Sequence, residues 1–211
     1  MENEVETAAP DTASADDAKV STRAPKRRAA KKSPARKRAR AKRVEEPPKP
    51  AGAKLVVFFR HGIAEDPSPD KPDGERSLTT SGHDRTKRAA RGLSRVMSPP
   101  DAICSSPLLR ALQTALWVTK AFGGKARVST SDALLPEAGP DDVRQLISVA
   151  EGTTIVLVGH EPNLSRSLAD LLGVPEVRAN LRRAGCVAVR LDEEGRGTLE
   201  WMLTPRALRS L

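Results

Sequence analysis

Short apolar runs alternate with amphipathic stretches from residue 53 onward. The run Leu55–Phe59 (LVVFF) contains no polar residue, which is typical of a strand buried on both faces of a parallel sheet. Two similar runs follow, at residues 101–106 (DAICSS) and 153–159 (TTIVLVG). Between and after these runs, apolar residues at helical spacing predict helices within residues 83–97, 107–124, 140–152 and 161–173.

This alternation of strands and helices predicts an α/β fold. We expect a three-layer sandwich, in which a mainly parallel central sheet is flanked by helices. Residues 185–205 (GCVAVRLDEEGRGTLEWMLTP) are typical of a hairpin with its turn at Glu194–Gly197. That hairpin adds antiparallel strands at the edge of the predicted sheet.

The basic charge of the chain is concentrated at its beginning. The net charge is +9, and residues 1–50 carry +6 of it, with twelve Lys and Arg and no carboxylate within residues 22–43. Since residues 1–50 hold few large apolar side chains, they cannot bury enough surface to offset the entropy of ordering. We therefore expect a disordered basic tail at 1–50 and one folded domain at 51–211.

So dense a basic cluster favours a polyanionic partner for residues 22–43. Nucleic acid or polyphosphate fits the charge, and an acidic protein fits it equally well. The alternative is a tail that only keeps the protein in solution. No aromatic residue lies among the charges, so stacking on bases is not expected.

The cysteines and the hydropathy pattern favour a cytoplasmic protein. Cys104 and Cys186 fall within apolar, strand-like segments without metal-ligand spacing, which indicates buried reduced thiols. No apolar leader segment and no stretch long enough to span a bilayer is found, so no membrane partner is expected.

Cationic residues and histidines follow three of the predicted strands. Arg60 and His61 end the first run, Arg110 lies about one helical turn after the second, and His160 follows the third. Ligands of α/β sheets bind outside the carboxyl ends of the strands, so these side chains are expected to converge there. Arginine binds phosphate oxygens bidentately. A histidine crowded by two guanidinium groups stays neutral and can act as a nucleophile toward phosphorus.

Five blocks in order resemble the histidine phosphatase superfamily, and most closely its short bacterial branch of SixA-type phosphohistidine phosphatases. They are FFRHGIAED, ERSLTTSG, ICSSPLLRALQTA, LLPE and VLVGHEPNLS, and together they span nearly all of residues 54–205. The resemblance implies a phosphoglycerate mutase-like fold and a metal-independent phosphatase that needs no cofactor. It implies that His61 is transiently phosphorylated, and that Arg60, Arg110 and His160 hold the phosphoryl oxygens.

The resemblance also bears on the substrate. Mutase-like members usually follow Arg-His-Gly with Thr or Ser and then Asn, whereas this chain has Ile63 and Ala64, which argues against a sugar-phosphate mutase. Glu137 in LLPE resembles the general acid of other branches, but it could equally line the pocket or cap a helix. The 49 residues between Arg110 and His160 leave no spare length for a lid. An open pocket of that kind suits a phosphate displayed on a protein.

Three functions are therefore weighed. The first is hydrolysis of phosphohistidine, or of another phosphorylated protein side chain, through phospho-His61. The second is a small-molecule phosphomonoesterase with the same mechanism. The third is a polyanion-tethered binding module that retains a phosphatase-like domain. Neither the oligomeric state nor the physiological substrate follows from the sequence.

Overall fold

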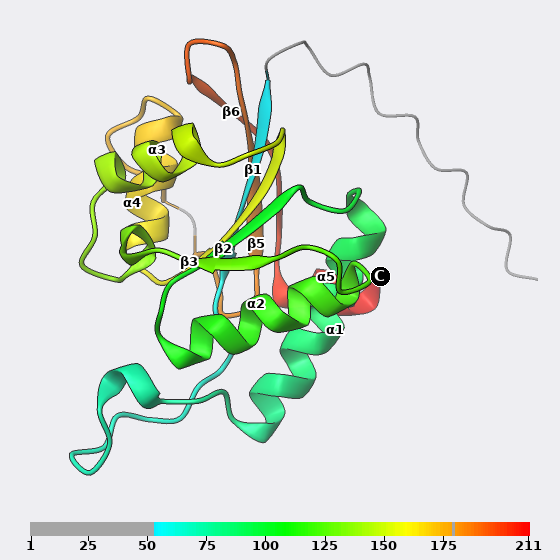
Figure 1. Cartoon of the computed structure of the whole chain (residues 1–211), viewed down its shortest axis with the longest axis vertical. Helices are drawn as coiled ribbons and strands as arrows, with labels where there is room; N and C mark the ends of the chain where they lie inside the picture. Colours follow the sequence, from blue (N-terminus) through cyan, green and yellow to red (C-terminus); the bar gives the residue numbers. More distant parts are fainter. Residues whose placement is uncertain (1–52, 179) are drawn as a thin grey trace, which may run out of the picture. The chain divides into compact units, whose positions relative to one another are not determined.

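The structure, a computed structural model, describes residues 53–178 and 180–211. The basic tail expected at residues 1–50 lies outside these residues, as does the start of the expected domain at residue 51. The described residues contain one six-stranded sheet with the strand order β3-β2-β4-β1-β5-β6 (Figure 1). Its strands are β1 (Lys54–Arg60), β2 (Ala102–Ser105), β3 (Val128–Thr130), β4 (Thr154–Gly159), β5 (Cys186–Leu191) and β6 (Gly197–Leu203).

The first four strands of the chain run parallel, and the last two form an antiparallel hairpin. β4 lies between β1 and β2, β3 is the outer partner of β2, and β5 pairs antiparallel with both β1 and β6. The sheet is thus mainly parallel, with the hairpin at one end. The predicted antiparallel hairpin at the edge of the sheet is confirmed, and β6 is the outermost strand.

Helices cover both faces of the sheet (Figure 1). On one side lie α3 (Pro140–Val149) and α4 (Asn163–Leu171), and on the other lie α1 (Thr80–Val96), α2 (Leu109–Ala121) and α5 (Pro205–Ser210). Two short 3-10 helices, η1 (Asp73–Glu75) and η2 (Asp132–Leu134), lie in the connections after β1 and β3. The predicted three-layer α/β sandwich is confirmed.

Strand β1 contributes side chains to the hydrophobic cores on both faces of the sheet. Its side chains alternate between faces, so Val57 and Phe59 pack in the core beneath α1, α2 and α5, whereas Val56 and Phe58 pack in the core beneath α3 and α4. All four are fully buried. A strand that contributes to two cores has no place for a polar side chain, which explains the uninterrupted apolar run.

Helix α5 is an α-helix that the sequence pattern did not predict. Thr204 caps its N-terminus through a hydrogen bond from Ala207 N, Pro205 occupies its first turn, and Leu208 is fully buried. Six residues provide too few periodic positions for a recognisable amphipathic pattern. No helix among the described residues is long and apolar enough to cross a membrane.

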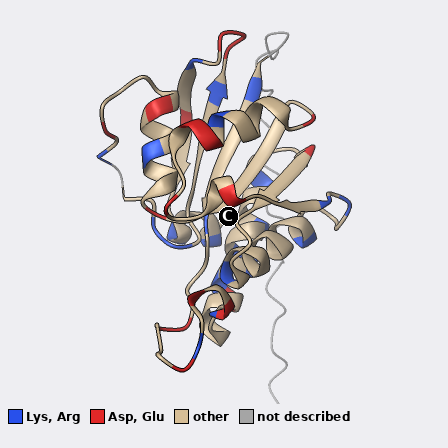
Figure 2. Cartoon of the chain, turned by 60° about the vertical axis from the view of Figure 1, so that its left-hand side comes forward, with Lys and Arg blue, Asp and Glu red and all other residues tan. Residues whose placement is uncertain are grey.

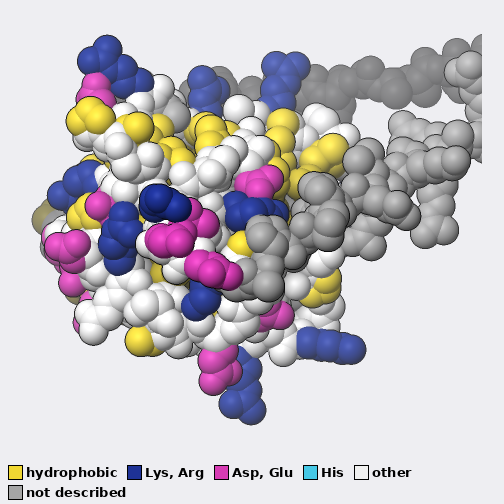
Figure 3. All heavy atoms as spheres, turned by 90° about the horizontal axis from the view of Figure 1, so that it is seen from above, with side chains coloured by type: hydrophobic (Ala, Val, Ile, Leu, Met, Phe, Trp, Pro, Cys, Tyr) yellow, Lys and Arg dark blue, Asp and Glu magenta, His cyan; other side chains and the backbone are white. Residues whose placement is uncertain are grey.

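The two ends of the sheet differ in chemistry. Figure 3 views the molecule from above, onto the amino ends of the parallel strands, where basic, acidic and apolar side chains intermingle and no described histidine is visible. The residues singled out by the sequence follow the opposite, carboxyl ends. The register of β1 with β4 pairs Arg60 with Gly159, which makes His61 and His160 neighbours.

Candidate active site

The two histidines meet where β1 and β4 end. His61 N donates to Gly159 O at 3.1 Å, and the ring centroids of His61 and His160 are 4.7 Å apart. Each side chain is more than nine-tenths buried. Residues 99 positions apart in the sequence are thus brought together by the pairing of two parallel strands, as the sequence predicted.

The hydrogen bond between His61 and Gly62 defines which ring nitrogen of His61 carries the proton. Its Nδ1 lies 2.7 Å from Gly62 O, and because a carbonyl oxygen only accepts, Nδ1 carries the proton. In a neutral ring, Nε2 then carries the lone pair. Burial first, and then the nearby His160, Arg110 and Arg60, lower the pKa of His61 to about 3, although its bond to Gly62 opposes them.

Gly62 allows the turn after β1 to lie against helices α1 and α2. Gly62 N donates to Thr114 Oγ1 at 3.0 Å, and Thr114 Oγ1 in turn donates to Arg110 O at 2.7 Å. A Cβ atom on Gly62 would lie 2.1 Å from Thr86 Oγ1, so the close approach requires glycine here. The turn that follows His61 and the first turn of α2 are therefore held together.

Both arginines have terminal guanidinium nitrogens engaged elsewhere, one in Arg60 and two in Arg110, and both keep an unpartnered Nε among the described residues. Arg110, in the first turn of α2, donates from Nη1 to Asp73 O at 2.7 Å and from Nη2 to Asp73 Oδ2 at 2.8 Å. Arg60 donates from Nη1 to Leu181 O at 2.9 Å. The buried Nε atoms of Arg60 and Arg110 have no hydrogen-bond partner among the described residues.

His160 is oriented by Ser106. Its Nε2 lies 2.9 Å from Ser106 Oγ, which itself accepts a hydrogen bond from Leu108 N at 3.3 Å. In the tautomer in which the Ser106 hydroxyl donates to Nε2, the proton of the neutral ring lies on Nδ1, a buried atom without a partner in the described structure. Burial first, and then the charge of Arg110, lower the pKa of His160 to about 3.

Buried, unpartnered donors thus surround a neutral histidine. They are Arg60 Nε, Arg110 Nε and His160 Nδ1, and all three side chains lie near enough to lower the pKa of His61. Buried donors are normally paired, so a group of three around one ring indicates a site for an anion with several acceptor oxygens. A tetrahedral phosphoryl group has that chemistry.

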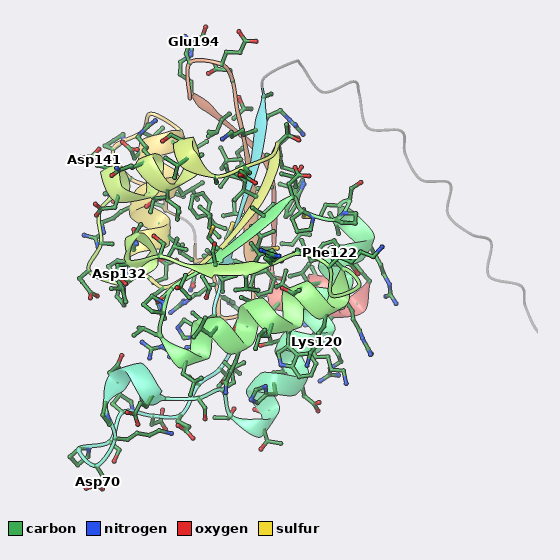
Figure 4. All side chains as sticks on the ribbon, viewed as in Figure 1. Asp70, Lys120, Phe122, Asp132, Asp141 and Glu194 are labelled. Carbon is green, nitrogen blue, oxygen red and sulfur yellow. The ribbon has the colours of Figure 1, made fainter. Side chains whose placement is uncertain are left out.

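Asp73 is the site residue that sequence reasoning missed. It lies in the connection between β1 and α1, which projects away from the sheet with Asp70 at its tip (Figure 4) and carries mostly acidic charges (Figure 2). Burial raises the pKa of Asp73, but hydrogen bonds from Arg110 and Arg76 outweigh that effect and lower it overall. The prediction that no segment covers the site was based only on the length of residues 110–160. The contact of Asp73 with Arg110 comes instead from residues 65–78.

Glu137 does not join the cluster. The residue is exposed after η2, and no hydrogen bond or ion pair within the described residues links its carboxylate to His61, Arg60, Arg110 or His160. The backbone before it is held by Asn163, whose Nδ2 donates to Ala133 O and Leu135 O. Its assignment as the general acid therefore stays a hypothesis. No group of three or more His, Cys, Asp or Glu suited to a metal is found in the described part of the chain.

Comparison with known proteins places this arrangement in a family. The model of the histidine phosphatase superfamily (branch 1) matches residues 56–135. The chain is 37% identical over 149 residues to an uncharacterized protein of Picosynechococcus, covering 64% of this chain and 84% of that protein. It is 30% identical over 161 residues to the phosphohistidine phosphatase SixA of Escherichia coli, covering 73% of this chain and 96% of SixA.

Solved structures show the same similarity. The protein histidine phosphatase SixA complexed with tungstate superposes with a TM-score of 0.65 at 26% identity, covering 73% of this chain and 99% of that one. A putative SixA from Agrobacterium tumefaciens, at 24% identity and a TM-score of 0.63, shares the fold, covering 72% of this chain and 99% of that one. The five sequence blocks, the site and these relatives agree: the chain belongs to the histidine phosphatase superfamily, in its SixA-type branch.

Proposed function

We propose that the chain hydrolyses phosphohistidine on proteins through a covalent phosphohistidine intermediate on His61. The observation that carries the proposal is the neutral His61 ring, whose Nδ1 proton is fixed on Gly62 O and whose Nε2 lone pair is surrounded by Arg60, Arg110 and His160. The phosphohistidine substrate is supported by the relatives named SixA. Catalysis then relies on positioned cations that stabilise the transferring phosphoryl group.

The reaction has two in-line steps. His61 Nε2 attacks phosphorus, a new P–N bond forms, and the P–N bond to the substrate imidazole breaks, after which that imidazole takes up a proton. Water then attacks phospho-His61, the second P–N bond breaks, and inorganic phosphate leaves while the lone pair returns to Nε2. Arg60, Arg110 and His160 donate hydrogen bonds to the phosphoryl oxygens in both steps. Arg110 exchanges part of its contact with Asp73 for these oxygens.

An imidazole leaving group reduces the need for a general acid. It is readily protonated near neutral pH, unlike the alkoxide that leaves from a phosphate ester. The exposed position of Glu137 is compatible with this substrate class, because no carboxylate has to be buried against the leaving group. Esters would depend on Glu137, so Glu137→Gln should slow ester hydrolysis more than phosphohistidine hydrolysis.

Phosphate release from a phosphohistidine peptide tests the proposal. Wild type, His61→Ala and the matched control His83→Ala are compared with EDTA present, alongside a phosphoserine peptide and p-nitrophenyl phosphate. His83 lies in α1, and its Nδ1 accepts a hydrogen bond from Trp117 Nε1. Its side chain has no hydrogen bond to a residue of the candidate site among the described residues. We expect a loss of about a thousandfold or more in His61→Ala only.

The same assay separates the competing functions. A higher kcat/KM on either ester than on the phosphohistidine peptide would replace the proposed substrate class by a small-molecule phosphomonoesterase. Hydrolysis that survives in His61→Ala would remove the covalent mechanism. No hydrolysis of any of the three substrates by wild type would leave the binding-module function.

A further inference from the structure

A pocket lined by arginines opens beside the candidate active site. Its volume is about 750 Å³, and no carboxylate is among the described residues that line it. Its six arginines are Arg60, Arg85, Arg182, Arg183, Arg206 and Arg209. Arg60 belongs both to this pocket and to the phosphoryl site, so the two sites are continuous.

The arginines come from four separate segments. Arg60 ends β1, Arg85 lies in α1, Arg182 and Arg183 precede β5, and the remaining two lie in α5. Packing of α1 against α5 assembles them: a Cβ atom on Gly92 of α1 would lie 1.9 Å from Leu208 O of α5. The cluster is thus a product of the tertiary structure, and the run of charges in residues 22–43 plays no part in it.

These arginines lack the carboxylates that usually pair with them. Among the described residues, no ion pair involves the side chains of Arg85, Arg182, Arg183, Arg206 or Arg209, whereas arginines elsewhere, such as Arg144 and Arg196, pair with Asp170 and Asp192. Burial lowers the pKa of Arg209, and the like charges of Arg85, Arg88 and Arg206 lower it further. Gathering unpaired guanidinium groups around one concave surface is unfavourable unless an anion binds there.

We propose that this pocket binds acidic side chains that flank the phosphorylated residue of a protein substrate. The proposal rests on the function proposed above and extends it to substrate recognition. Because Arg60 is shared, a ligand in the pocket lies within a few residues of the phosphoryl group on the same polypeptide. Ile63, Ala184 and Pro205 also line the pocket, and such apolar contacts suit a peptide better than a bare phosphate chain.

Paired peptide substrates test the proposal on the full chain. Two phosphohistidine peptides are compared that differ only in their flanking residues, Asp and Glu in one, Asn and Gln in the other. The enzymes are wild type, the double variant Arg182→Gln/Arg183→Gln, and the matched control Arg127→Gln, an exposed arginine that does not line the pocket. The basic tail is identical in all three, so differences between them report on the pocket.

We expect wild type and Arg127→Gln to prefer the acidic peptide by about five- to tenfold in kcat/KM at low salt, mostly through KM. The preference should fall to about twofold or less in the double variant, and also for wild type in 0.5 M NaCl. Equal kcat/KM for both peptides in wild type, or an undiminished preference in the double variant, would overturn the proposal.

Two further measurements test the pocket independently of the proposed catalytic function. Fluorescence anisotropy of an unphosphorylated acidic peptide measures docking without turnover, so weaker binding to the double variant than to Arg127→Gln supports the pocket even if neither phosphopeptide is hydrolysed. Unchanged binding would count against it. Short-chain polyphosphate is also tested as a competitor of the labelled peptide. If it competes more strongly than unlabelled acidic peptide, and if this competition is lost in the double variant, the pocket is assigned to phosphate chains instead.

Discussion

His61 and His160 lie in contact, yet their ring nitrogens are engaged differently. His61 is fixed through Nδ1 on a backbone carbonyl, which leaves the lone pair of the neutral ring on Nε2, whereas His160 contacts Ser106 through Nε2 and has its Nδ1 unpartnered among the described residues. Both rings are kept neutral, chiefly by burial. In the proposed mechanism one residue type thus provides both the nucleophile and a phosphate-binding donor, according to which nitrogen its neighbour holds.

Neutral, buried histidines predict a specific loss of stability in mild acid. Both have a pKa of about 3 in the folded chain, against 6.5 for an ordinary histidine, so below pH 6.5 the unfolded chain binds protons that the folded chain does not. The free energy of unfolding should therefore fall between pH 7 and 5, by up to about 2 kcal/mol for each histidine. Urea unfolding at the two pH values measures it.

The double variant His61→Gln/His160→Gln is the control for this pH dependence. It retains all other titratable groups, so its free energy of unfolding should change much less over the same interval. The low pKa of Glu65, about 2, and that of Asp73 contribute only at lower pH, where carboxylates of the unfolded chain begin to protonate. An equal pH dependence in wild type and double variant would show that the rings are not held neutral.

Asp73 competes with phosphate for Arg110. Its carbonyl and carboxylate oxygens accept from both terminal nitrogens of that guanidinium, which are also suited to phosphoryl oxygens. Asp73→Asn removes the negative charge, so we expect inorganic phosphate to bind about three- to tenfold more tightly. Product inhibition or calorimetry measures this. The control is Asp70→Asn, at the tip of the same connection (Figure 4), which should bind phosphate as wild type does. If phosphate instead binds more weakly to Asp73→Asn than to wild type, Asp73 supports the site.

At the level of secondary structure, the sequence predicted elements whose pattern is long or uninterrupted. The buried run of β1, the four helices, two strands and terminal hairpin predicted after it, and the convergence of Arg60, His61, Arg110 and His160 all follow from periodicity and from the position of strand ends. Contacts set by tertiary packing were not predictable. Asp73 reaches Arg110 across 37 residues, and the six residues of α5 are recognised only once Leu208 is seen to be buried.

The contact of α1 with α5 predicts the effect of a glycine substitution. Gly92→Ala should raise helix propensity by about 0.5–1 kcal/mol, but its Cβ would meet Leu208 O at 1.9 Å, and backbone cannot yield as a side chain end can. We expect a net destabilisation of about 1–3 kcal/mol in urea unfolding. The neighbouring, exposed Arg91→Ala should change stability by less than about 0.5 kcal/mol. A stabilised Gly92→Ala would mean that α5 is free to move away.

At the scale of the whole molecule, positive charge is concentrated at two places, the basic run at residues 22–43 and the arginine pocket. The net charge of the sequence does not distinguish them. Residues 1–50 carry +6 of the net +9, yet the arginine pocket belongs to residues 51–211, whose net charge is only +3. A small net charge there conceals a local cluster, because its acidic residues lie elsewhere, including the connection between β1 and α1 (Figure 2). The dense basic run at residues 22–43 therefore predicted a polyanion partner for the tail, whereas the net charge gave no sign of the pocket.

The tail and the catalytic part should be separable. The described residues 53–178 and 180–211 contain both hydrophobic cores and all four clustered site residues, so we expect deletion of residues 1–50 to change kcat/KM on a free phosphohistidine peptide by less than about twofold. The same deletion should remove binding to duplex DNA or polyphosphate that the full chain shows at low salt. Twelve cationic residues without an interspersed carboxylate predict affinity that falls steeply as salt rises from 50 to 200 mM.

Turnover and polyanion binding, measured on the full chain, the deletion variant and Arg182→Gln/Arg183→Gln, show how the tail and the domain divide these two activities. A more than tenfold fall in turnover after deletion would show that the tail takes part in catalysis. Polyanion binding that survives deletion and disappears in Arg182→Gln/Arg183→Gln would place the polyanion in the arginine pocket, next to Arg60. Loss of binding with unchanged turnover is the result we expect, since the tail then determines where the phosphatase is held while His61 and its cationic neighbours determine what it does there.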